Sequence, residues 1–174
     1  MPAASSNKMK GQWERRIFML CAFTGHRPQR LPWGGREEDP RCHALKILLS
    51  EAVEAAATRG CTGFLCGMAL GCDTWFAEIV LEKGLKLAAM LPCPGQADHW
   101  PKKDRARYEG LLARCDEIIV LEPAYSDGCM LRRNRAMIER ADILISVYDG
   151  CGGGTGNTVS YAKERGLEIM PIWV

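Results

Sequence analysis

Short apolar runs alternate with amphipathic stretches along most of the chain. Every residue from Ile17 to Phe23 is apolar, which is typical of a strand buried on both faces of a parallel sheet. Similar runs predict further strands at residues 63–66, 87–91, 117–121, 143–147 and 168–173.

The stretches between these strands have the period of helices that pack one face inward. The first helix carries a single apolar stripe and ends at Gly60; the stripe comprises Leu45, Leu48, Leu49, Ala52, Val53 and Ala56. The next helix is predicted to start at Asp73 and to close at Gly84. Others are predicted at residues 102–114, 129–140 and 158–165. Asp73 and Asn157 are the predicted N-cap residues.

Strands that alternate with helices and are joined by short loops predict an α/β fold. We expect a three-layer sandwich with a mostly parallel sheet, helices on both sides and right-handed crossovers. A length of 174 residues suits one sizeable core, so a single domain over residues 15–174 is expected. Residues 1–14 are rich in Ser, Lys and Asn and predict a loose tail.

The composition, with 47% hydrophobic and 25% charged residues, is that of an ordinary soluble globular protein. A net charge of only +2 gives no reason to expect a broad nucleic-acid-binding face. No apolar run approaches the roughly 20 residues needed to cross a bilayer, and the N-terminal segment lacks a signal-peptide core. A cytoplasmic protein without a membrane partner is expected.

The nine cysteines do not have the spacing of a metal site. There is no CxxC pair, and the closest groupings are Cys42-His43 and the run Cys61, Cys66, Cys72. An odd number of cysteines in a chain without an export signal fits reduced thiols. No metal and no cofactor are therefore expected.

The clearest binding feature is a glycine-rich loop at residues 150–156, between a predicted strand and a predicted helix. Glycines let a ligand approach the backbone closely, and the free N–H groups at a helix N-terminus attract phosphate or carboxylate. A flexible surface loop that caps a helix would have a similar sequence. On this loop alone, both interpretations stay open.

Two more loops with binding chemistry, at residues 24–27 and 67–73, also follow predicted strands. Ligands of such sheets bind beyond the carboxyl ends of the strands, where the strand order reverses. If the three loops form one pocket, the first strand must lie between the second and the fifth, which predicts the order 4-3-2-1-5-6. The loops contain neither GxGxxG after the first strand nor GxxxxGK[ST], which disfavours standard NAD and P-loop NTPase sites.

The helix at residues 129–140 has an anomaly, because its apolar stripe also contains Arg133 and Asn134. An unpaired buried cation is very unfavourable, so an inward Arg133 needs a partner. That partner could be a carboxylate at the core edge, or the side chain could lie along the surface with its charge in water. The other interpretation is that Arg133 and Asn134 reach a ligand held by the glycine loops.

Several side chains near the loops allow both a chemical and a structural role. His26 could act as a general base or a phosphate donor, or could cap a turn. Asp73 could polarise a ribose hydroxyl, although helix capping also accounts for it. Glu78 lies near a glycine loop without a capping role, and a solvated position fits it too. Trp33 and Trp100 could stack on a base or pack as lids over the core.

Four segments, at residues 21–28, 67–78, 133–137 and 153–158, resemble the YpsA-type branch of the SLOG superfamily. They read CAFTGHRP, GMALGCDTWFAE, RNRAM and GGTGNT, and the resemblance spans about residues 17–174. The resemblance implies a Rossmann-like fold. The superfamily includes the DNA-processing protein DprA and the LOG phosphoribohydrolases, which cleave the N-glycosidic bond of cytokinin nucleotides. For the YpsA branch, it implies a sensor or binder of nucleotide-related ligands.

The chain is similar to the LOG enzymes in part only. Their site uses an Arg from an RKxxM-like helix, which Arg133 and Met137 match, and a Glu from a PGGxGTxxE loop. In this chain the position of that Glu falls near Val159 or Ser160, so the expected carboxylate is missing. Glycosidic hydrolysis needs a carboxylate, so LOG-type catalysis would require Glu78 or Asp98 as a substitute.

The sequence therefore predicts the binding or sensing of a phosphate-bearing, nucleotide-related small molecule, such as a nucleoside phosphate, a nucleotide-sugar or an ADP-ribose-like compound, with a regulatory role. The alternative is an N-glycosidase or phosphoribohydrolase acting on a nucleoside monophosphate, with Glu78, Arg133 and Asp98 as candidate catalytic residues. Single-stranded DNA binding, as in DprA, is weakened by the low net charge, and a steep salt dependence of DNA affinity would revive it.

The predicted ligand-binding residues come from the three loops and the 129–140 helix: Thr24, Gly25, His26, Arg27, Gly67, Met68, Gly71, Asp73, Arg133, Asn134, Gly153, Gly154, Thr155, Gly156, Asn157 and Thr158. A homodimer contact through Trp173 or the alanine-rich first helix stays open, because core packing accounts for both features equally well.

Overall fold

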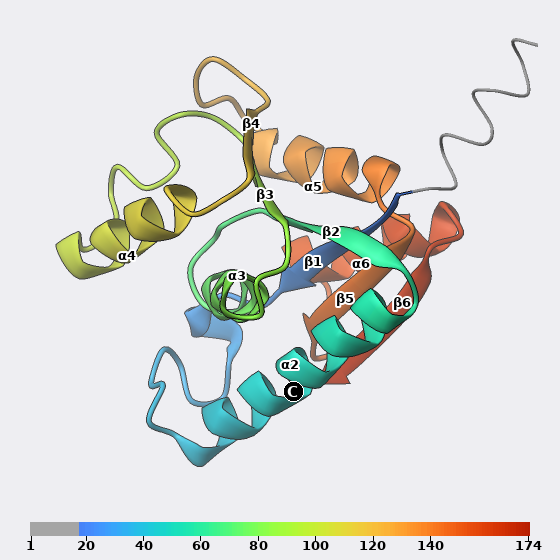
Figure 1. The fold of residues 1–174 in the computed structure, drawn as a ribbon. Coiled ribbons are helices and arrows are strands. Elements are labelled where there is room, and N and C mark those ends of the chain that lie inside the picture. Colours follow the sequence, from blue (N-terminus) through green and yellow to red (C-terminus); the bar gives the residue numbers. More distant parts are fainter. Residues whose placement is uncertain (1–17) are drawn as a thin grey trace, which may run out of the picture.

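The computed structural model describes residues 18–174, in which strands and helices alternate (Figure 1). The predicted tail at residues 1–14 and the start of the first predicted strand lie outside the described residues. The strands are β1 (Met19–Gly25), β2 (Cys61–Cys66), β3 (Leu87–Leu91), β4 (Glu117–Val120), β5 (Ile143–Tyr148) and β6 (Glu168–Trp173). The helices are the 3-10 turn η1 (Pro28–Arg30), α2 (Pro40–Thr58), α3 (Cys72–Glu82), α4 (Lys102–Leu112), α5 (Cys129–Arg140) and α6 (Gly154–Glu164).

The six strands form one sheet in the order β4-β3-β2-β1-β5-β6, and every neighbouring pair is parallel. This confirms the predicted Rossmann-like α/β fold and the predicted strand order. The chain moves outward from β1 to β4 and then returns to the other side of β1 with β5. The strand order therefore reverses at β1, and the carboxyl end of β1 is the expected place for a ligand.

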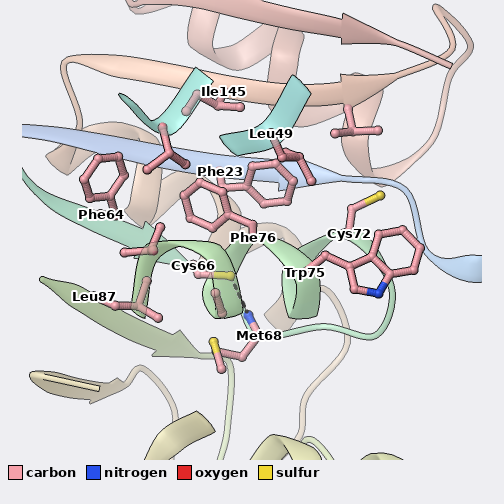
Figure 2. Packing of buried hydrophobic residues seen from close by; sticks show 14 of the residues in the cluster. Phe23, Leu49, Phe64, Cys66, Met68, Cys72, Trp75, Phe76, Leu87 and Ile145 are labelled. Atoms are coloured by element: carbon pink, nitrogen blue, oxygen red, sulfur yellow. Dashed lines mark hydrogen bonds between the residues drawn. The ribbon is translucent and has the colours of Figure 1, made fainter. Parts of the chain in front are cut away.

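Helices cover both faces of the sheet. As Figure 1 shows, α2 and α3 pack together on one face, with α4 against α3, while α5 and α6 pack together on the other. The larger core lies under α2 and α3. There Phe23 of β1 stacks on Phe76 of α3 with 4.3 Å between ring centroids, and Phe64 of β2 lies 6.1 Å from Phe76 (Figure 2). A second, smaller core under α5 and α6 contains Met137 and Leu144.

The two predicted N-caps were wrong. The N-cap of α3 is Gly71 and that of α6 is Gly153, so these helices begin before Asp73 and Asn157. Both glycines have positive φ angles, 88° and 126°, which side-chain-bearing residues rarely adopt. The chain turns into each helix through this glycine conformation, and no side-chain cap is needed.

Other predicted bounds also needed correction. Thr24 and Gly25, predicted to lie in a loop, are the last two residues of β1. Leu48, predicted to face inward, is 46% exposed, because it lies at the edge of an α2 stripe that instead includes the buried Cys42. Within residues 18–174, no helix is both long and apolar enough to cross a bilayer.

Candidate functional site

A cavity of about 330 Å³ lies at the carboxyl end of β1, where the strand order reverses. Residues of all three predicted loops line it, together with residues of η1 and α5. The lining residues are Phe23, Thr24, Gly25, His26, Arg27, Gln29, Arg30, Ala69, Asp73, Met130, Arg133, Asn134, Met137, Gly152, Gly153, Gly154 and Thr155. The fold therefore brings the three loops to one hollow, as their positions after β1, β2 and β5 predicted.

The first turn of α6 forms one wall of the cavity. The backbone N–H of Asn157 donates to the carbonyl oxygen of Gly153 at 2.8 Å, and the N–H groups of the preceding helical residues have no acceptor within the helix. Two of these residues, Gly154 and Thr155, line the cavity. Free N–H groups and the positive end of the helix dipole make this wall suited to an anion.

Two arginines add positive charge to the cavity. The side chain of Arg27 is exposed and lines the cavity, and within residues 18–174 it makes no hydrogen bond or ion pair. Arg30 also lines the cavity, and its Nη2 lies 3.2 Å from Oδ2 of Asp149. The sequence did not single out Arg30 or Gln29. Their position just after Pro28 could have indicated them, because a 3-10 turn there keeps the chain beside the end of β1.

His26 connects the first loop to the third. It is buried, and its Nε2 lies 2.9 Å from Asp149 Oδ1 and 3.1 Å from the backbone nitrogen of Asp149. One nitrogen cannot do both: an unprotonated Nε2 accepts from the N–H of Asp149, whereas a protonated Nε2 donates to the carboxylate. The N–H of Cys151, then His26 and Arg30, hold the pKa of Asp149 well below its ordinary value.

Arg133 is only 4% exposed, as its place on the apolar stripe predicted. Its Nη1 donates to the carbonyl oxygens of Gly67 and, at 3.2 Å, Met90, which lie at the ends of β2 and β3. The sequence had suggested either a carboxylate partner or a side chain lying along the surface. The structure shows neither, because these two acceptors are backbone carbonyls. The Nη2 group, with two N–H donors, has only the weakly accepting sulfur of Met130 at 3.9 Å. Burial lowers the pKa of the guanidinium, and nearby Asp73 opposes this effect.

Asp73 lies in the first turn of α3 and is 6% exposed. Its Oδ2 accepts a hydrogen bond from the N–H of Ala69 at 3.0 Å, which folds the glycine loop back onto the helix. Burial raises the pKa of this carboxyl group, and the positive charges of Arg133 and then Arg27 act against that rise. Asp73 therefore brings a poorly solvated carboxyl group into a cavity that is otherwise rich in cations.

The loop at residues 67–71 is held from two sides. The Nε2 of Gln96 donates to the carbonyl oxygens of Gly67 and Met68 at 3.1 and 2.8 Å, and Thr74 Oγ1 donates to that of Ala69 at 3.1 Å. Met68 has a φ of 58°, an uncommon conformation for a residue with a side chain. Such strain persists only where its surroundings fix the backbone, as they do here.

Asn134 lines the cavity, but both of its polar ends have partners within the protein. Its Oδ1 accepts from Arg133 Nε at 2.7 Å, and its Nδ2 donates to Thr158 Oγ1 at 3.0 Å. Thr158 Oγ1 in turn donates to the carbonyl oxygen of Gly154 at 2.8 Å. This chain of hydrogen bonds fixes α5 against the first turn of α6, which gives Asn134 and Thr158 a positioning role.

Six predicted ligand-binding residues do not line the cavity: Gly67, Met68, Gly71, Gly156, Asn157 and Thr158. Gly67 and Gly156 are required by close packing instead. A Cβ at Gly156 would lie 2.7 Å from the carbonyl oxygen of Cys151, and one at Gly67 would collide with Arg133. Gly67 and Gly156 therefore allow the close packing around the cavity without lining it themselves.

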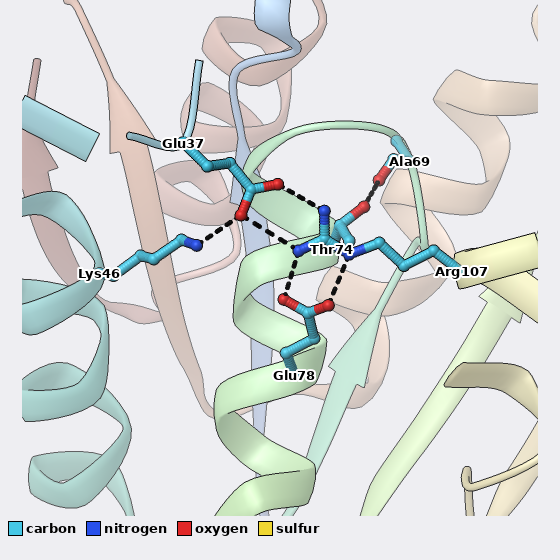
Figure 3. A network of polar contacts seen from close by, with 6 residues as sticks. All are labelled: Glu37, Lys46, Ala69, Thr74, Glu78 and Arg107. Atoms are coloured by element: carbon cyan, nitrogen blue, oxygen red, sulfur yellow. Dashed lines mark hydrogen bonds and ion pairs between the residues drawn. The ribbon is translucent and has the colours of Figure 1, made fainter. Parts of the chain in front are cut away.

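The two substitute catalytic carboxylates are not among the cavity residues either. Figure 3 shows Glu78 paired with Arg107, whose Nε and Nη2 donate to it at 2.6 and 2.7 Å, in a network that also holds Glu37 and Lys46. Asp98 is likewise absent from the lining. Among residues 18–174, no group of three or more His, Cys, Asp or Glu side chains has an arrangement that could hold a metal ion.

The two loop tryptophans stay outside the cavity lining. Trp33 is buried in the larger core, and Trp100 packs against that core, with its ring 5.1 Å from that of Tyr108. Both positions agree with the interpretation of these residues as lids over the core.

Comparison with known proteins assigns the chain to a family. A family model described as "YpsA: YspA SLOG family" matches residues 21–165. A "UPF0398 protein" of Bacillus pumilus (strain SAFR-032) is 31% identical over 137 residues, which cover 75% of this chain and 73% of the relative.

Two solved structures show a similar fold. DNA processing protein A (DprA) from Helicobacter pylori has a TM-score of 0.61 and 19% identity, over 90% of this chain and 66% of that chain. The Moco carrier protein of Chlamydomonas rheinhardtii has a TM-score of 0.52 and 15% identity, over 88% of this chain and 75% of that chain. At these identities the likeness concerns the fold alone. The family model and the Bacillus relative carry the assignment, and the chain belongs to the YpsA SLOG family.

Proposed function

We propose that the cavity binds a small, phosphate-bearing molecule related to nucleotides, and that the protein acts as a binder or sensor of that molecule. The observation that carries the proposal is that one cavity contains both the free first-turn N–H groups of α6 and the side chain of Arg27, which has no partner within residues 18–174. The buried guanidinium of Arg133, with N–H donors left over, adds a third source of positive charge. Backbone amides and arginines together are the usual partners of phosphate in proteins.

The size of the cavity favours a compact ligand. About 330 Å³ is near the lower end of the roughly 300–1,000 Å³ found for small-molecule sites. A nucleoside monophosphate or a sugar phosphate suits such a volume better than the larger ADP-ribose-like compounds.

Asp73 supports a second candidate function, the hydrolysis of an N-glycosidic bond. Val159, at the position expected for the glutamate, is buried in the smaller core, and Ser160 is exposed and carries no carboxyl group. Among the residues that line the cavity, Asp73 alone carries a carboxyl group, so general acid or base catalysis would fall to it. Release of free base from a nucleoside monophosphate, detected by chromatography and lost in Asp73→Asn, would support this function over simple binding.

Single-stranded DNA is a third candidate ligand, because the solved DprA of Helicobacter pylori has a single-stranded DNA binding mode. A net charge of +2 argues against a long electrostatic contact with DNA. A DNA affinity that falls steeply with salt would favour this candidate over the small molecule.

Thermal unfolding in the presence of ligands tests the main proposal. We expect AMP or ribose 5-phosphate at millimolar concentration to raise Tm, since a ligand at 100 times its Kd stabilises the folded state by about 2.7 kcal/mol. Arg27→Gln should weaken binding about tenfold or more, because it removes a charge-assisted hydrogen bond to phosphate.

The matched control is Arg36→Gln, on the same connection between β1 and α2. Arg36 is 64% exposed and does not line the cavity, so its loss should leave affinity unchanged. Equal effects of the two variants, or no stabilisation by any probe, would contradict the proposal.

A further inference from the structure

One oxygen of the Asp73 carboxyl group has no donor among the residues that the structure describes. Its Oδ2 accepts from the N–H of Ala69, but Oδ1 has no hydrogen bond to any group of residues 18–174. The side chain is 6% exposed, and the cavity is the space that it lines. Oδ1 is not fully buried and is open to the cavity, so a group that enters the cavity can donate to it in place of water.

Neither nearby arginine donates a hydrogen bond to Asp73 within residues 18–174. Arg133 acts on the charge of Asp73, but its hydrogen bonds to oxygen go to the carbonyl groups of Gly67 and Met90 and to the side chains of Asn134 and Gln96. Arg27 also acts on that charge, and its side chain makes no hydrogen bond within the described residues. Helix capping does not explain the residue either, because the N-cap of α3 is Gly71.

The cavity is therefore chemically two-sided. Figure 1 shows α3 and α6 on opposite faces of the sheet, so Asp73 and the free amides of α6 approach the end of β1 from different sides. A phosphate suits the α6 side and would be repelled by a carboxylate beside it. A hydroxyl group donates to a carboxylate at little cost, so the ligand that satisfies both sides bears a phosphate and hydroxyl groups on one small skeleton.

We infer that Asp73 is a specificity-determining residue that accepts a hydrogen bond from a ligand hydroxyl, so that the cavity selects a sugar phosphate over a phosphate without hydroxyl groups. This inference rests on the proposed function, because it takes the phosphate to lie at the first turn of α6. To that function the inference adds the chemical class of the group that carries the phosphate, namely a sugar with free hydroxyl groups. Burial raises the pKa of the carboxyl group because it removes water from the carboxylate. A ligand hydroxyl that donates to the carboxylate would replace part of this lost hydration.

Two phosphate monoesters of equal charge test the inference on the unmodified protein. Ribose 5-phosphate carries hydroxyl groups, and monomethyl phosphate carries none. Calorimetric titration should give ribose 5-phosphate the lower Kd by about tenfold or more, the factor expected for a hydrogen bond to a charged group. Equal affinities for the two probes would overturn the inference while leaving phosphate binding in place.

The variant Asp73→Asn separates recognition from folding. It should weaken ribose 5-phosphate by about tenfold or more and leave monomethyl phosphate unchanged or bound more tightly, because a negative charge is removed from the cavity. Arg27→Gln is the matched comparison and should weaken both probes by a similar factor. A purely structural role of Asp73 would weaken both probes together, and that outcome overturns the inference.

The possible failures are distinguishable. If the unmodified protein binds neither probe, the proposed function and the inference both fail. If it binds both probes equally, or if Asp73→Asn leaves the preference for ribose 5-phosphate intact, only the inference fails. Because the comparison on the unmodified protein needs no variant, the inference remains falsifiable even if Asp73→Asn does not fold.

Discussion

The guanidinium group of Arg133 occupies the space that a side chain at position 67 would need. A Cβ atom at Gly67 would collide with Cζ and Nη1 of Arg133, and the same Nη1 donates a hydrogen bond to the carbonyl oxygen of Gly67. The glycine after β2 thus leaves room for an arginine of α5. The requirement comes from close approach, since φ at Gly67 is not among the positive values.

Replacing this glycine should disturb the buried arginine. We expect Gly67→Ala to lower the free energy of unfolding by about 2 kcal/mol, the usual size of an overpacking effect, because Arg133 must move and weaken its hydrogen bonds. Urea-induced unfolding measures the change. Gly110→Ala, in the exposed part of α4 with no atom near its Cβ, is the control and should be neutral or stabilise by up to about 1 kcal/mol. Equal unfolding free energies for Gly67→Ala and the unmodified protein would show that the arginine adapts freely.

Much of the fold and part of the site followed from sequence patterns. The alternation of apolar runs and helical stripes predicted the sheet, and the positions of three polar loops after strands predicted the strand order. The same stripe placed Arg133 inward, as the structure confirms. Two of its partners could not be predicted, because they are backbone carbonyls at strand ends and carbonyl groups carry no residue identity.

The two wrong N-caps have a common physical cause. Asp73 and Asn157 were predicted as N-caps from side-chain preference, but the positive φ of Gly71 and Gly153 starts the helices earlier. That shift moves Asp73 from a capping position into the first turn of α3, where its carboxyl group lines the cavity. The pairing of Arg30 with Asp149 spans 119 positions and has no periodic signature, so it required the tertiary structure.

The hydroxyl group of Thr158 should contribute to stability through the link between α5 and α6. Thr158→Val keeps the shape of the side chain but leaves Asn134 Nδ2 and the carbonyl oxygen of Gly154 without their partner. We expect a loss of about 1–2 kcal/mol in the free energy of unfolding, measured in urea. The control Thr62→Val removes an exposed hydroxyl with a 3.5 Å contact and should change stability by less than about 0.5 kcal/mol. Equal losses of unfolding free energy in Thr158→Val and Thr62→Val would contradict a stabilising role of the link between α5 and α6.

Acid should weaken the charge network of Glu37, Lys46, Glu78 and Arg107. Burial alone would raise the pKa of Glu37, but donors on Arg107 and Lys46 outweigh it and lower the pKa from its ordinary 4.5 to about 2. A lowered folded-state pKa gives stability that is present above pH 4.5 and is lost as the pH falls towards 2. Because Glu37 is 33% exposed, solvent screening limits the contribution to about 1 kcal/mol.

The pH dependence of unfolding therefore reports on this network. Between pH 6 and pH 2, Glu37→Gln should lose about 1 kcal/mol less stability than the unmodified protein, because it has no carboxylate to protonate. Its neighbour Glu38 is exposed and forms no ion pair within residues 18–174, so Glu38→Gln should keep the original pH profile. If the two variants share one profile, the network does not contribute to acid stability.

Cys151 should be the one rapidly reacting thiol of the folded protein. All nine cysteines are free, and Cys151 is the exposed one, on the loop between β5 and α6. Seven others are buried. Cys115 is partly exposed, but burial and then Asp116 raise its pKa to about 11, so little thiolate forms near neutral pH.

An aromatic disulfide reagent at pH 7.5 should label one thiol quickly, and all nine in denaturant. The fast phase should disappear in Cys151→Ser and persist in Cys115→Ser. A second fast thiol in the native protein would mean that the cores open more readily than their packing indicates, because thiolate reactivity requires access as well as charge.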